Sequence, residues 1–249
     1  MSLKDQTILL TGAARGMGVA TAKECARRGA QVILHYHASA RAAHELQDEL
    51  GAAVIGCVGE DLSQSGAGAR LWAAASKLGR PITALVNNAG IYAASPLHGD
   101  IDAWRRAWDA NLAVNLLAPA ELCRCAVQDF LRRGGGRIVN IASRAGIRGD
   151  DSDHDAYAAA KGGLLAQTRT LARALAGENI LCYAIAPGWV ETDMAPGDGP
   201  QRETALAGIP LGKMAQPEEI AALTAFLLSG ACPSATGATF DVNGASHVR

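Results

Sequence analysis

The sequence has 249 residues, of which 49% are hydrophobic, and its 23 basic and 24 acidic side chains leave a formal net charge of -1. This balance gives no electrostatic reason to expect a nucleic-acid partner, and no apolar run reaches the 18 residues that a membrane span would need. The first residues, MSLKDQTILL, lack the apolar stretch of a signal peptide, and the six cysteines follow neither zinc nor redox spacing, so we expect a cytoplasmic protein with free thiols.

Short apolar runs alternate with longer segments of helical periodicity along the whole chain. The apolar runs are mostly unbroken, as expected for strands that are buried on both faces of a parallel sheet. We predict strands over 7–11, 31–36, 53–58, 82–87, 137–143, 180–186 and 238–242. We predict helices over 17–29, 39–51, 102–133, 156–177 and 217–230.

Repeated β-α-β units with right-handed crossovers predict an α/β fold. We expect one domain over residues 1–249, a doubly wound Rossmann fold with a mostly or wholly parallel seven-stranded sheet and helices on both faces. The segment 194–212, MAPGDGPQRETALAGIPLG, is rich in Gly and Pro and has no clear pattern. A segment of this length and composition is typical of a flexible lid over a substrate.

The first predicted strand runs into the glycine-rich stretch TGAARGMG, residues 11–18. Gly12, Gly16 and Gly18 lie where the strand turns into a helix, so a pyrophosphate could approach the backbone and the positive end of the helix dipole. Their spacing is G-x-x-x-G-x-G rather than the usual G-x-G-x-x-G of dinucleotide sites. The alternative is a turn that needs glycine only for its backbone conformation, but the position in the first βα unit favours cofactor binding.

A tyrosine and a lysine are four residues apart in the alanine-rich segment DHDAYAAAKGG, residues 153–163. On a helix, Tyr157 and Lys161 lie on the same face. An ammonium beside a phenol favours the phenolate and lowers the pKa of the tyrosine. Ser143 ends a predicted strand at the carboxyl edge of the sheet, where open α/β folds bind ligands. Each residue alone has a structural explanation, but together they predict a proton-transfer site.

Five motifs in this order resemble the short-chain dehydrogenase/reductase family. They are Thr11-Gly12-x-x-x-Gly16-x-Gly18, Asn87-Asn88-Ala89-Gly90, Ser143, Tyr157-x-x-x-Lys161 and Pro187-Gly188. Their spacing is nearly that of the family and they span almost the whole chain, which is most similar to the 3-oxoacyl-(acyl-carrier-protein) reductase-like branch. The resemblance implies an oxidoreductase that transfers a hydride between nicotinamide and a carbonyl or secondary alcohol.

The resemblance also implies roles for four catalytic residues. Tyr157 would be the general acid in reduction and the general base in oxidation, and Lys161 would also bind the nicotinamide ribose. Ser143 would hold the substrate oxygen as charge develops. Asn111, in the stretch WDANL, would bind a water of the proton relay. Asn115 is an alternative four residues further on, and the WDANL context favours Asn111.

NADP(H) is favoured over NAD(H) because the second predicted strand ends without a carboxylate that could bond the ribose hydroxyls. Arg15 in the glycine-rich stretch could meet an added 2′-phosphate. The alternative is a solvated Arg15 and a neutral surface His37. The candidate cofactor-binding residues are Gly12, Arg15, Gly16, Met17, Gly18, His37, Ser39, Asp61, Leu62, Asn88, Ala89, Gly90, Tyr157, Lys161, Pro187, Gly188, Val190 and Thr192.

The physiological substrate stays open at this point. The 3-oxoacyl-thioester reductase is the first interpretation, and Arg132, Arg133 and Arg173 could dock an acyl carrier. The acidic segment 150–155 either caps the following helix or lines the substrate entrance, where it would disfavour an acidic carrier. Reductases or dehydrogenases of cyclic ketones, polyols or other secondary alcohols are the alternative.

A catalytically silent dinucleotide-binding sensor or scaffold is the alternative of another class, and the complete set of four catalytic candidates argues against it. A sugar-nucleotide epimerase is disfavoured because the chain ends with the sheet and has no further substrate domain. The C-terminal stretch carries Asn243-Gly244-Ala245 where the family usually has Asp-Gly-Gly. The resemblance implies a homotetramer.

Overall fold

A computed structural model describes residues 1–248 of the chain, and its centre is one sheet of seven strands. All neighbouring strands are parallel, in the order β3-β2-β1-β4-β5-β6-β7, which confirms the doubly wound fold. The strand order reverses between β1 and β4, and such a switch point is where open α/β sheets bind ligands. The strands are β1 (Thr7–Leu10), β2 (Gln31–Tyr36), β3 (Val54–Gly59), β4 (Ala84–Asn87), β5 (Gly136–Ile141), β6 (Ile180–Pro187) and β7 (Thr239–Val242).

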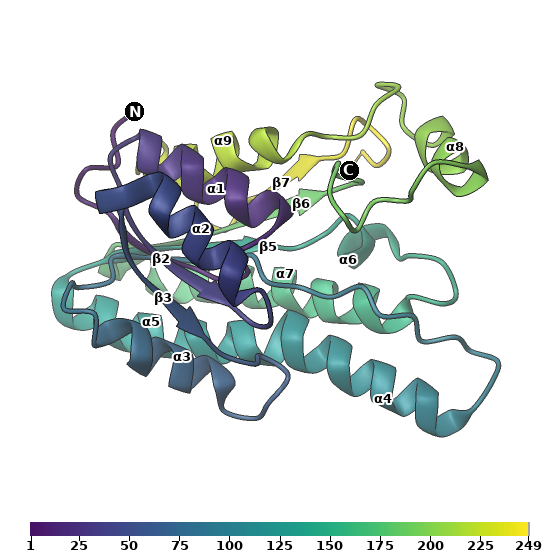
Figure 1. Cartoon of the computed structure of the whole chain (residues 1–249), viewed down its shortest axis with the longest axis horizontal. Helices are drawn as coiled ribbons and strands as arrows, with labels where there is room; N and C mark the ends of the chain where they lie inside the picture. Colours follow the sequence, from purple (N-terminus) through teal and green to yellow (C-terminus); the bar gives the residue numbers. More distant parts are fainter. Residues whose placement is uncertain (249) are drawn as a thin grey trace.

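Helices cover both faces of this sheet (Figure 1). They are α1 (Gly16–Arg27), α2 (Ala40–Leu50), α3 (Ala67–Ser76), α4 (Ile101–Leu112), α5 (Ala118–Arg133), α6 (Ala145–Arg148), α7 (Asp155–Leu175), α8 (Pro200–Ala207) and α9 (Pro217–Leu228). In Figure 1, α1, α2 and α9 lie over one face, and α3, α5 and α7 lie over the other. The two layers explain why the strands are apolar on both sides.

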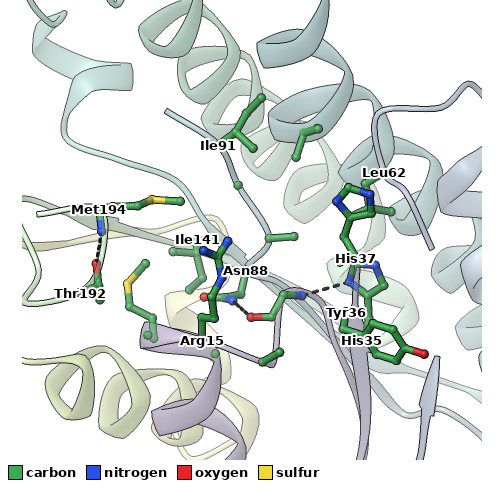
Figure 2. Close-up of a pocket in the computed structure, with 18 of the residues that line it drawn as sticks. Arg15, His35, Tyr36, His37, Leu62, Asn88, Ile91, Ile141, Thr192 and Met194 are labelled. Carbon is green, nitrogen blue, oxygen red and sulfur yellow. Dashed lines mark hydrogen bonds between the residues drawn. The ribbon is translucent and has the colours of Figure 1, made fainter. Parts of the chain in front are cut away.

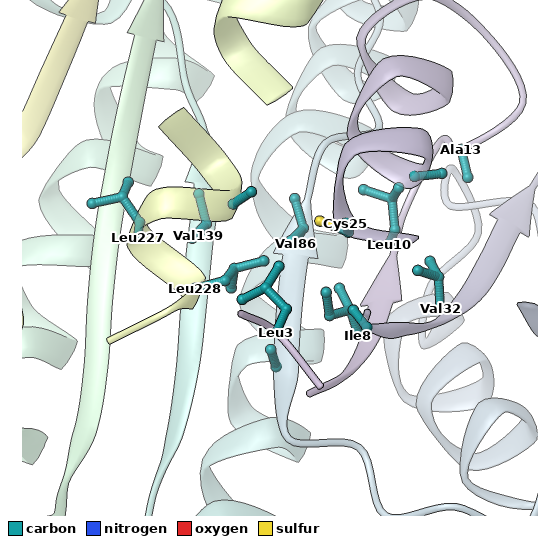
Figure 3. Packing of buried hydrophobic residues seen from close by; sticks show 14 of the residues in the cluster. Leu3, Ile8, Leu10, Ala13, Cys25, Val32, Val86, Val139, Leu227 and Leu228 are labelled. Atoms are coloured by element: carbon teal, nitrogen blue, oxygen red, sulfur yellow. The ribbon is translucent and has the colours of Figure 1, made fainter. Parts of the chain in front are cut away.

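The alternation of side chains along β1 divides the core into two clusters. Ile8 and Leu10 face α1 and α9, where they pack in one cluster with Leu227 and Leu228 (Figure 3). Leu9 points to the opposite face and packs in the cluster that α3 and α5 complete. All of these side chains are almost fully buried, so this short strand contributes apolar area to both faces of the sheet.

The segment predicted as one helix over 102–133 contains a π-helical turn. Helices α4 and α5 are joined by a π turn at Ala113–Leu117, in which Asn115 is the buried residue. A π turn inserts one extra residue into the helix and is frequent at functional sites. Helix α8 forms within 194–212, a stretch predicted to lack regular structure, and it begins at Pro200, a residue type favoured in the first turn.

Helix α3 was missed because its N-terminal cap comes from a distant part of the chain. The carboxylate of Glu121, on α5, accepts hydrogen bonds from the backbone N–H groups of Gly66 and Gly68 at 3.2 and 2.9 Å. These bonds satisfy donors that a local Ser or Asp usually satisfies. All six cysteines are free thiols. Within residues 1–248, every helix is too short or too polar to cross a membrane.

Candidate active site

Two adjoining cavities open at the carboxyl ends of the central strands. The larger has a volume of about 340 Å³ and runs from the glycine-rich turn to Tyr157 and Lys161. The smaller has a volume of about 90 Å³ and runs from Tyr157 to Ser143 and Trp189. Both are lined by Tyr157 and Thr192, so a molecule in either cavity can approach the phenol.

The glycine-rich turn is closed so tightly that side chains would not fit. Gly12 has a φ of +64°, and its N–H donates to Nδ1 of His35 at 3.1 Å. A Cβ on Gly18 would lie 2.1 Å from the carbonyl oxygen of Gly12, and one on Gly16 would lie 2.9 Å from the Thr192 side chain. The turn therefore requires glycine at these positions because neighbouring protein atoms approach the backbone closely, and the binding of a pyrophosphate there stays a prediction.

The floor of the larger cavity is bonded to the glycine-rich turn through Thr11. Its hydroxyl oxygen accepts hydrogen bonds from the N–H groups of Asn88 and Ala89, both at 2.9 Å. The Asn88 amide donates to the carbonyl oxygens of Thr11 and Gly12 at 2.9 and 3.1 Å. The buried Oδ1 of Asn88 accepts no hydrogen bond from residues 1–248, so this end of the cavity can accept a donor from a ligand.

The other end of this cavity is lined by Arg15, His37, Ser39, Asp61 and Leu62 (Figure 2). Arg15 is exposed and forms no ion pair with the described residues, whereas His37 lies 3.8 Å from Asp61. A hydrogen bond from the Ser63 backbone holds the pKa of Asp61 below its ordinary value. Ser39 precedes α2, and its hydroxyl makes no capping bond. This end therefore offers a free guanidinium, a free hydroxyl and the positive end of a helix dipole.

Tyr157 and Lys161 share one face of α7, as the four-residue spacing predicts. Lys161 is 3% exposed, its Nζ donates to the carbonyl oxygen of Ile141 at 2.9 Å, and it lies 5.7 Å from the centre of the Tyr157 ring. Burial raises the pKa of Tyr157 to about 12, and a hydrogen bond with Ser143 partly opposes this. Burial also lowers the pKa of Lys161 to about 8. Desolvation of the phenol thus outweighs the lowering expected from the ammonium.

Of the two asparagines considered for the relay, Asn115 lies beside the lysine. A methyl group on Gly90 would lie 2.9 Å from Oδ1 of Asn115 and 3.5 Å from Nζ of Lys161. Asn115 also bonds the N–H and the carbonyl oxygen of Ile91 at 3.1 and 3.0 Å. Asn111 donates to the carbonyl oxygens of Ala93 and Ala107 and accepts a hydrogen bond from Asn115 at 3.2 Å. Neither asparagine lines the two cavities. Asn115 is thus the asparagine nearer to Lys161, and the role of Asn111 in the proton relay stays a prediction.

The segment after β6 forms the border between the two cavities. Pro187, Gly188 and Val190 line the smaller cavity, and Thr192 lines both. A Cβ on Gly188 would lie 2.9 Å from Cβ of Asn243, so glycine is required for this close approach to the segment after β7. The structure therefore brings all of the sequence-predicted cofactor-binding residues to the two cavities.

Three residues of the smaller cavity, Tyr92, Arg144 and Trp189, had no sequence signal, whereas Asp150 belongs to the acidic segment considered for the entrance. Of the carboxylates in the acidic segment 150–155, Asp150 alone lines this cavity. Asp155 instead is the first residue of α7, where its Oδ1 accepts from the Ala156 N–H at 2.7 Å and its charge suits the helix dipole. The position at the start of α7 thus explains Asp155, and the entrance hypothesis holds for Asp150 only.

The arginines considered for carrier docking lie away from both cavities. Arg133 donates to the carbonyl oxygen of Ile82, before β4 begins, and therefore lies at the amino edge of the sheet. Arg132 forms an ion pair with Asp129 in the same turn. Arg173 is in the last turn of α7, 16 residues beyond Tyr157, or about 24 Å along the helix.

The parallel sheet, the glycine-rich turn at its switch point and the buried Tyr–Lys pair define an α/β oxidoreductase. A family model described as Enoyl-(Acyl carrier protein) reductase matches residues 12–247. The chain belongs to the short-chain dehydrogenase/reductase family.

Relatives with different substrates cover the whole chain. A 3-oxoacyl-[acyl-carrier-protein] reductase FabG of Pseudomonas aeruginosa is 37% identical, with 100% of both chains covered. An L-rhamnose 1-dehydrogenase (NAD(P)(+)) of Azotobacter vinelandii is 34% identical, with 100% of this chain and 99% of that one covered. A solved 3-oxoacyl (acyl-carrier-protein) reductase of Agrobacterium tumefaciens with NADP bound has a TM-score of 0.88 and 31% identity, covering 98% of this chain and 95% of its own.

Proposed function

We propose that this protein is an NADP(H)-dependent reductase of carbonyl compounds, with Tyr157 as its general acid and base. The observation that carries this proposal is the position of Tyr157, which lines both cavities and is hydrogen-bonded to Ser143. A cofactor in the larger cavity and a carbonyl in the smaller one would therefore meet beside a proton donor.

The residues of the larger cavity fit a dinucleotide. Gly12, Gly16 and Gly18 allow the tight turn that brings the N-terminus of α1 to the cavity, where its N–H groups can bind a pyrophosphate. Ile141 and Val114 provide apolar walls near Lys161. When bound, NADPH supplies the hydride that reaches the carbonyl carbon.

The adenosine end of the cavity favours the 2′-phosphate of NADP(H). No carboxylate follows β2, where an NAD-binding site usually has one. Arg15 can bond a phosphate bidentately, while Ser39 and the N-terminus of α2 can donate further hydrogen bonds. The NADP found in the Agrobacterium tumefaciens relative supports this choice.

The catalytic residues of this chain would act on the carbonyl oxygen. Tyr157 donates its phenolic proton to that oxygen in reduction and takes it back in oxidation. Ser143 donates a hydrogen bond to the same oxygen as negative charge develops. Lys161 stabilises the resulting phenolate, and Asn115 fixes the Gly90–Ile91 backbone against which Lys161 lies.

Two substrate subclasses are candidates. Reduction of a 3-oxoacyl thioester, presented by an acyl carrier, is supported by the Pseudomonas aeruginosa relative. Reduction or oxidation of cyclic ketones, polyols or other secondary alcohols is supported by the Azotobacter vinelandii relative and by the charged lining of the smaller cavity. The position of the three arginines away from the cavities is an argument against docking of a carrier to this chain alone.

We also propose the organisation that the family resemblance implied. Residues 1–249 would form one domain, working as a cytoplasmic homotetramer. Segment 194–212 would act as the lid over the smaller cavity, because Met194 and Ala195 line it. An ion pair between Arg202 of α8 and Glu191 ties this segment to the end of the cavity.

The test is consumption of NADPH and NADH by the purified protein with a 3-oxoacyl thioester, a ketose and a cyclic ketone. We expect turnover with NADPH, and Arg15→Ala should weaken NADPH binding about tenfold or more while NADH binding changes little. Tight NADPH binding without turnover of any carbonyl would instead support the silent binding protein. Equal effects of Arg15→Ala on both cofactors would contradict the assignment of the 2′-phosphate site.

A further inference from the structure

The smaller cavity is lined by one cationic and one anionic side chain that form no ion pair with each other. Arg144 and Asp150 are the two charged residues among the described residues that line it. Within residues 1–248, neither side chain forms an ion pair within 4.0 Å, although both are only partly exposed. Both side chains have hydrogen-bond partners in the protein and keep unused donors or acceptors, so each can also bind a polar group in the cavity.

Asp150 retains capacity to accept hydrogen bonds from a ligand. Its Oδ2 accepts from the hydroxyl of Tyr92 at 3.3 Å, and its Oδ1 accepts from the N–H of Asp151 at 3.1 Å. A carboxylate has about four acceptor sites, so roughly two remain.

Arg144 retains capacity to donate. Its Nη1 donates to the hydroxyl of Ser246 in the C-terminal segment, and the guanidinium has five N–H donors in all. Burial lowers the pKa of Arg144, and the guanidinium of Arg148 lowers it further, whereas the carboxylate of Asp150 raises it. An oxygen atom of a ligand in the cavity can therefore accept a hydrogen bond from the half-buried Arg144 guanidinium.

The aromatic wall of the cavity holds Asp150 in a fixed position. The Tyr92 ring lies flat on His154, with 3.8 Å between ring centres and 2° between planes. Its other contacts are edge-on, at 4.8 Å to Tyr157 and 6.1 Å to Trp189. His154 is in turn bonded to Asp151 at 2.7 Å. Tyr92 is packed on several sides, and the carboxylate of Asp150 accepts a hydrogen bond from its hydroxyl. This bond therefore places Asp150 beside the catalytic phenol of Tyr157.

We propose that Asp150 and Arg144 bind a hydroxyl group on the carbon next to the substrate carbonyl, so that this protein acts on neutral hydroxylated ketones and aldehydes. A hydroxyl can donate to Asp150 and accept from Arg144 at once. An ammonium in the same place pairs with Asp150 but is repelled by Arg144, and a carboxylate pairs with Arg144 but is repelled by Asp150, so neither satisfies both side chains. The methylene chain of an apolar ketone displaces water from the unused donors and acceptors of both side chains and offers no hydrogen bond in return, which is unfavourable. This inference rests on the proposed carbonyl reduction and selects the second of its two substrate subclasses.

The experiment compares kcat/KM with NADPH for four ketones that differ in one group. Hydroxyacetone, butanone, aminoacetone and acetoacetate carry a hydroxyl, a methyl, an ammonium and a carboxylate on the methylene carbon beside the same acetyl carbonyl, and a six-carbon series allows for a larger substrate. We expect the hydroxyketone to exceed the apolar ketone by roughly 10- to 100-fold, as for one hydrogen bond to a charged group.

The variants are Asp150→Ala, Asp150→Asn and, as a matched control, Asp153→Ala, whose side chain is exposed. We expect Asp150→Ala to remove most of the preference and Asp150→Asn, which keeps one acceptor oxygen, to retain part of it. Asp153→Ala should leave both rates and their ratio unchanged. The ratio is measured on one protein sample, so partial unfolding of a variant changes both rates and cancels.

Three results would overturn the inference while leaving carbonyl reduction intact. These are equal kcat/KM for the hydroxyketone and the apolar ketone, a preference that survives Asp150→Ala, and a higher kcat/KM for an acetoacetyl thioester, aminoacetone or acetoacetate than for the hydroxyketones. If no carbonyl compound is reduced with either cofactor, the proposed function itself fails. The two failures are therefore distinguishable in one set of assays.

Discussion

Replacing the buried lysine should inactivate the protein and make it more stable. Burial lowers the pKa of Lys161 from 10.5 to about 8, and each pKa unit corresponds to about 1.4 kcal/mol. The charged lysine therefore costs about 3 kcal/mol of folding free energy at neutral pH. Lys161→Met removes this cost and loses one hydrogen bond, worth about 1 kcal/mol, to the carbonyl oxygen of Ile141. We expect a net gain of about 2 kcal/mol, or roughly 4 to 8 °C in Tm.

The sign of the pH dependence gives an independent check. Because the folded state binds this proton more weakly than the unfolded state, stability rises with pH between the two pKa values. The cost of Lys161 is fully present below pH 8 and is lost above pH 10.5. Urea unfolding at pH 7 and near pH 10.5 should therefore show the Lys161→Met gain at the lower pH only. The exposed Lys77→Met is the control, and a Lys161→Met variant less stable than the wild type at pH 7 would refute the reasoning.

Three further outcomes are expected. Gly18→Ala places a Cβ 2.1 Å from a backbone oxygen and should cost about 1 to 3 kcal/mol and weaken NADPH binding at least about tenfold, whereas Gly177→Ala, with open space around it, should change neither. Equal calorimetric Tm values for the two variants would show that the turn can relax. Ala245 has a φ of +64°, so Ala245→Gly should leave the Tm unchanged or raise it by a few degrees, and a clear fall would contradict this account of the strain. Since burial raises the pKa of Tyr157 to about 12, alcohol oxidation, which needs the phenolate, should rise with pH from 7 to 9 by up to about tenfold per pH unit while ketone reduction does not. Oxidation that is independent of pH over this range would remove Tyr157 as the base.

The fold could be predicted from the sequence because its signals are local. Unbroken apolar runs such as 31–36 identify buried strands, and the strand observed at Gln31–Tyr36 has the predicted bounds. Helix α3 could not be predicted in the same way, because the carboxylate that caps it belongs to Glu121, more than 50 residues further along the chain.

Residues at the ends of strands lie in the cavities as expected, but the geometry of the helix determines which asparagine lies nearer to Lys161. Their four-residue separation on one helix predicts similar faces for Asn111 and Asn115, and only the WDANL context favoured Asn111. The π turn around Asn115 changes the helix at this point and brings this residue against Gly90.

The substrate side of the site had the weakest sequence signal. Tyr92, Arg144 and Asp150 come from three separate segments, and only their packing brings them into one cavity. The acidic segment 150–155 gave a hint of a polar entrance, yet its carboxylates divide between the start of α7, ion pairing and the cavity. Side-chain direction in a loop is not encoded in a local pattern, which is why the structure was needed to single out Asp150.

The most direct test of the central proposal is single-turnover hydride transfer by the wild type and Tyr157→Phe, with NADPH and a reducible carbonyl compound. NADPH affinity is measured on the same samples by fluorescence titration. We predict that Tyr157→Phe binds NADPH with nearly unchanged Kd and transfers hydride at least about 100-fold more slowly, because the proton donor is removed while both cavities remain. Hydride transfer at the wild-type rate by Tyr157→Phe would contradict the assignment of Tyr157 as the general acid.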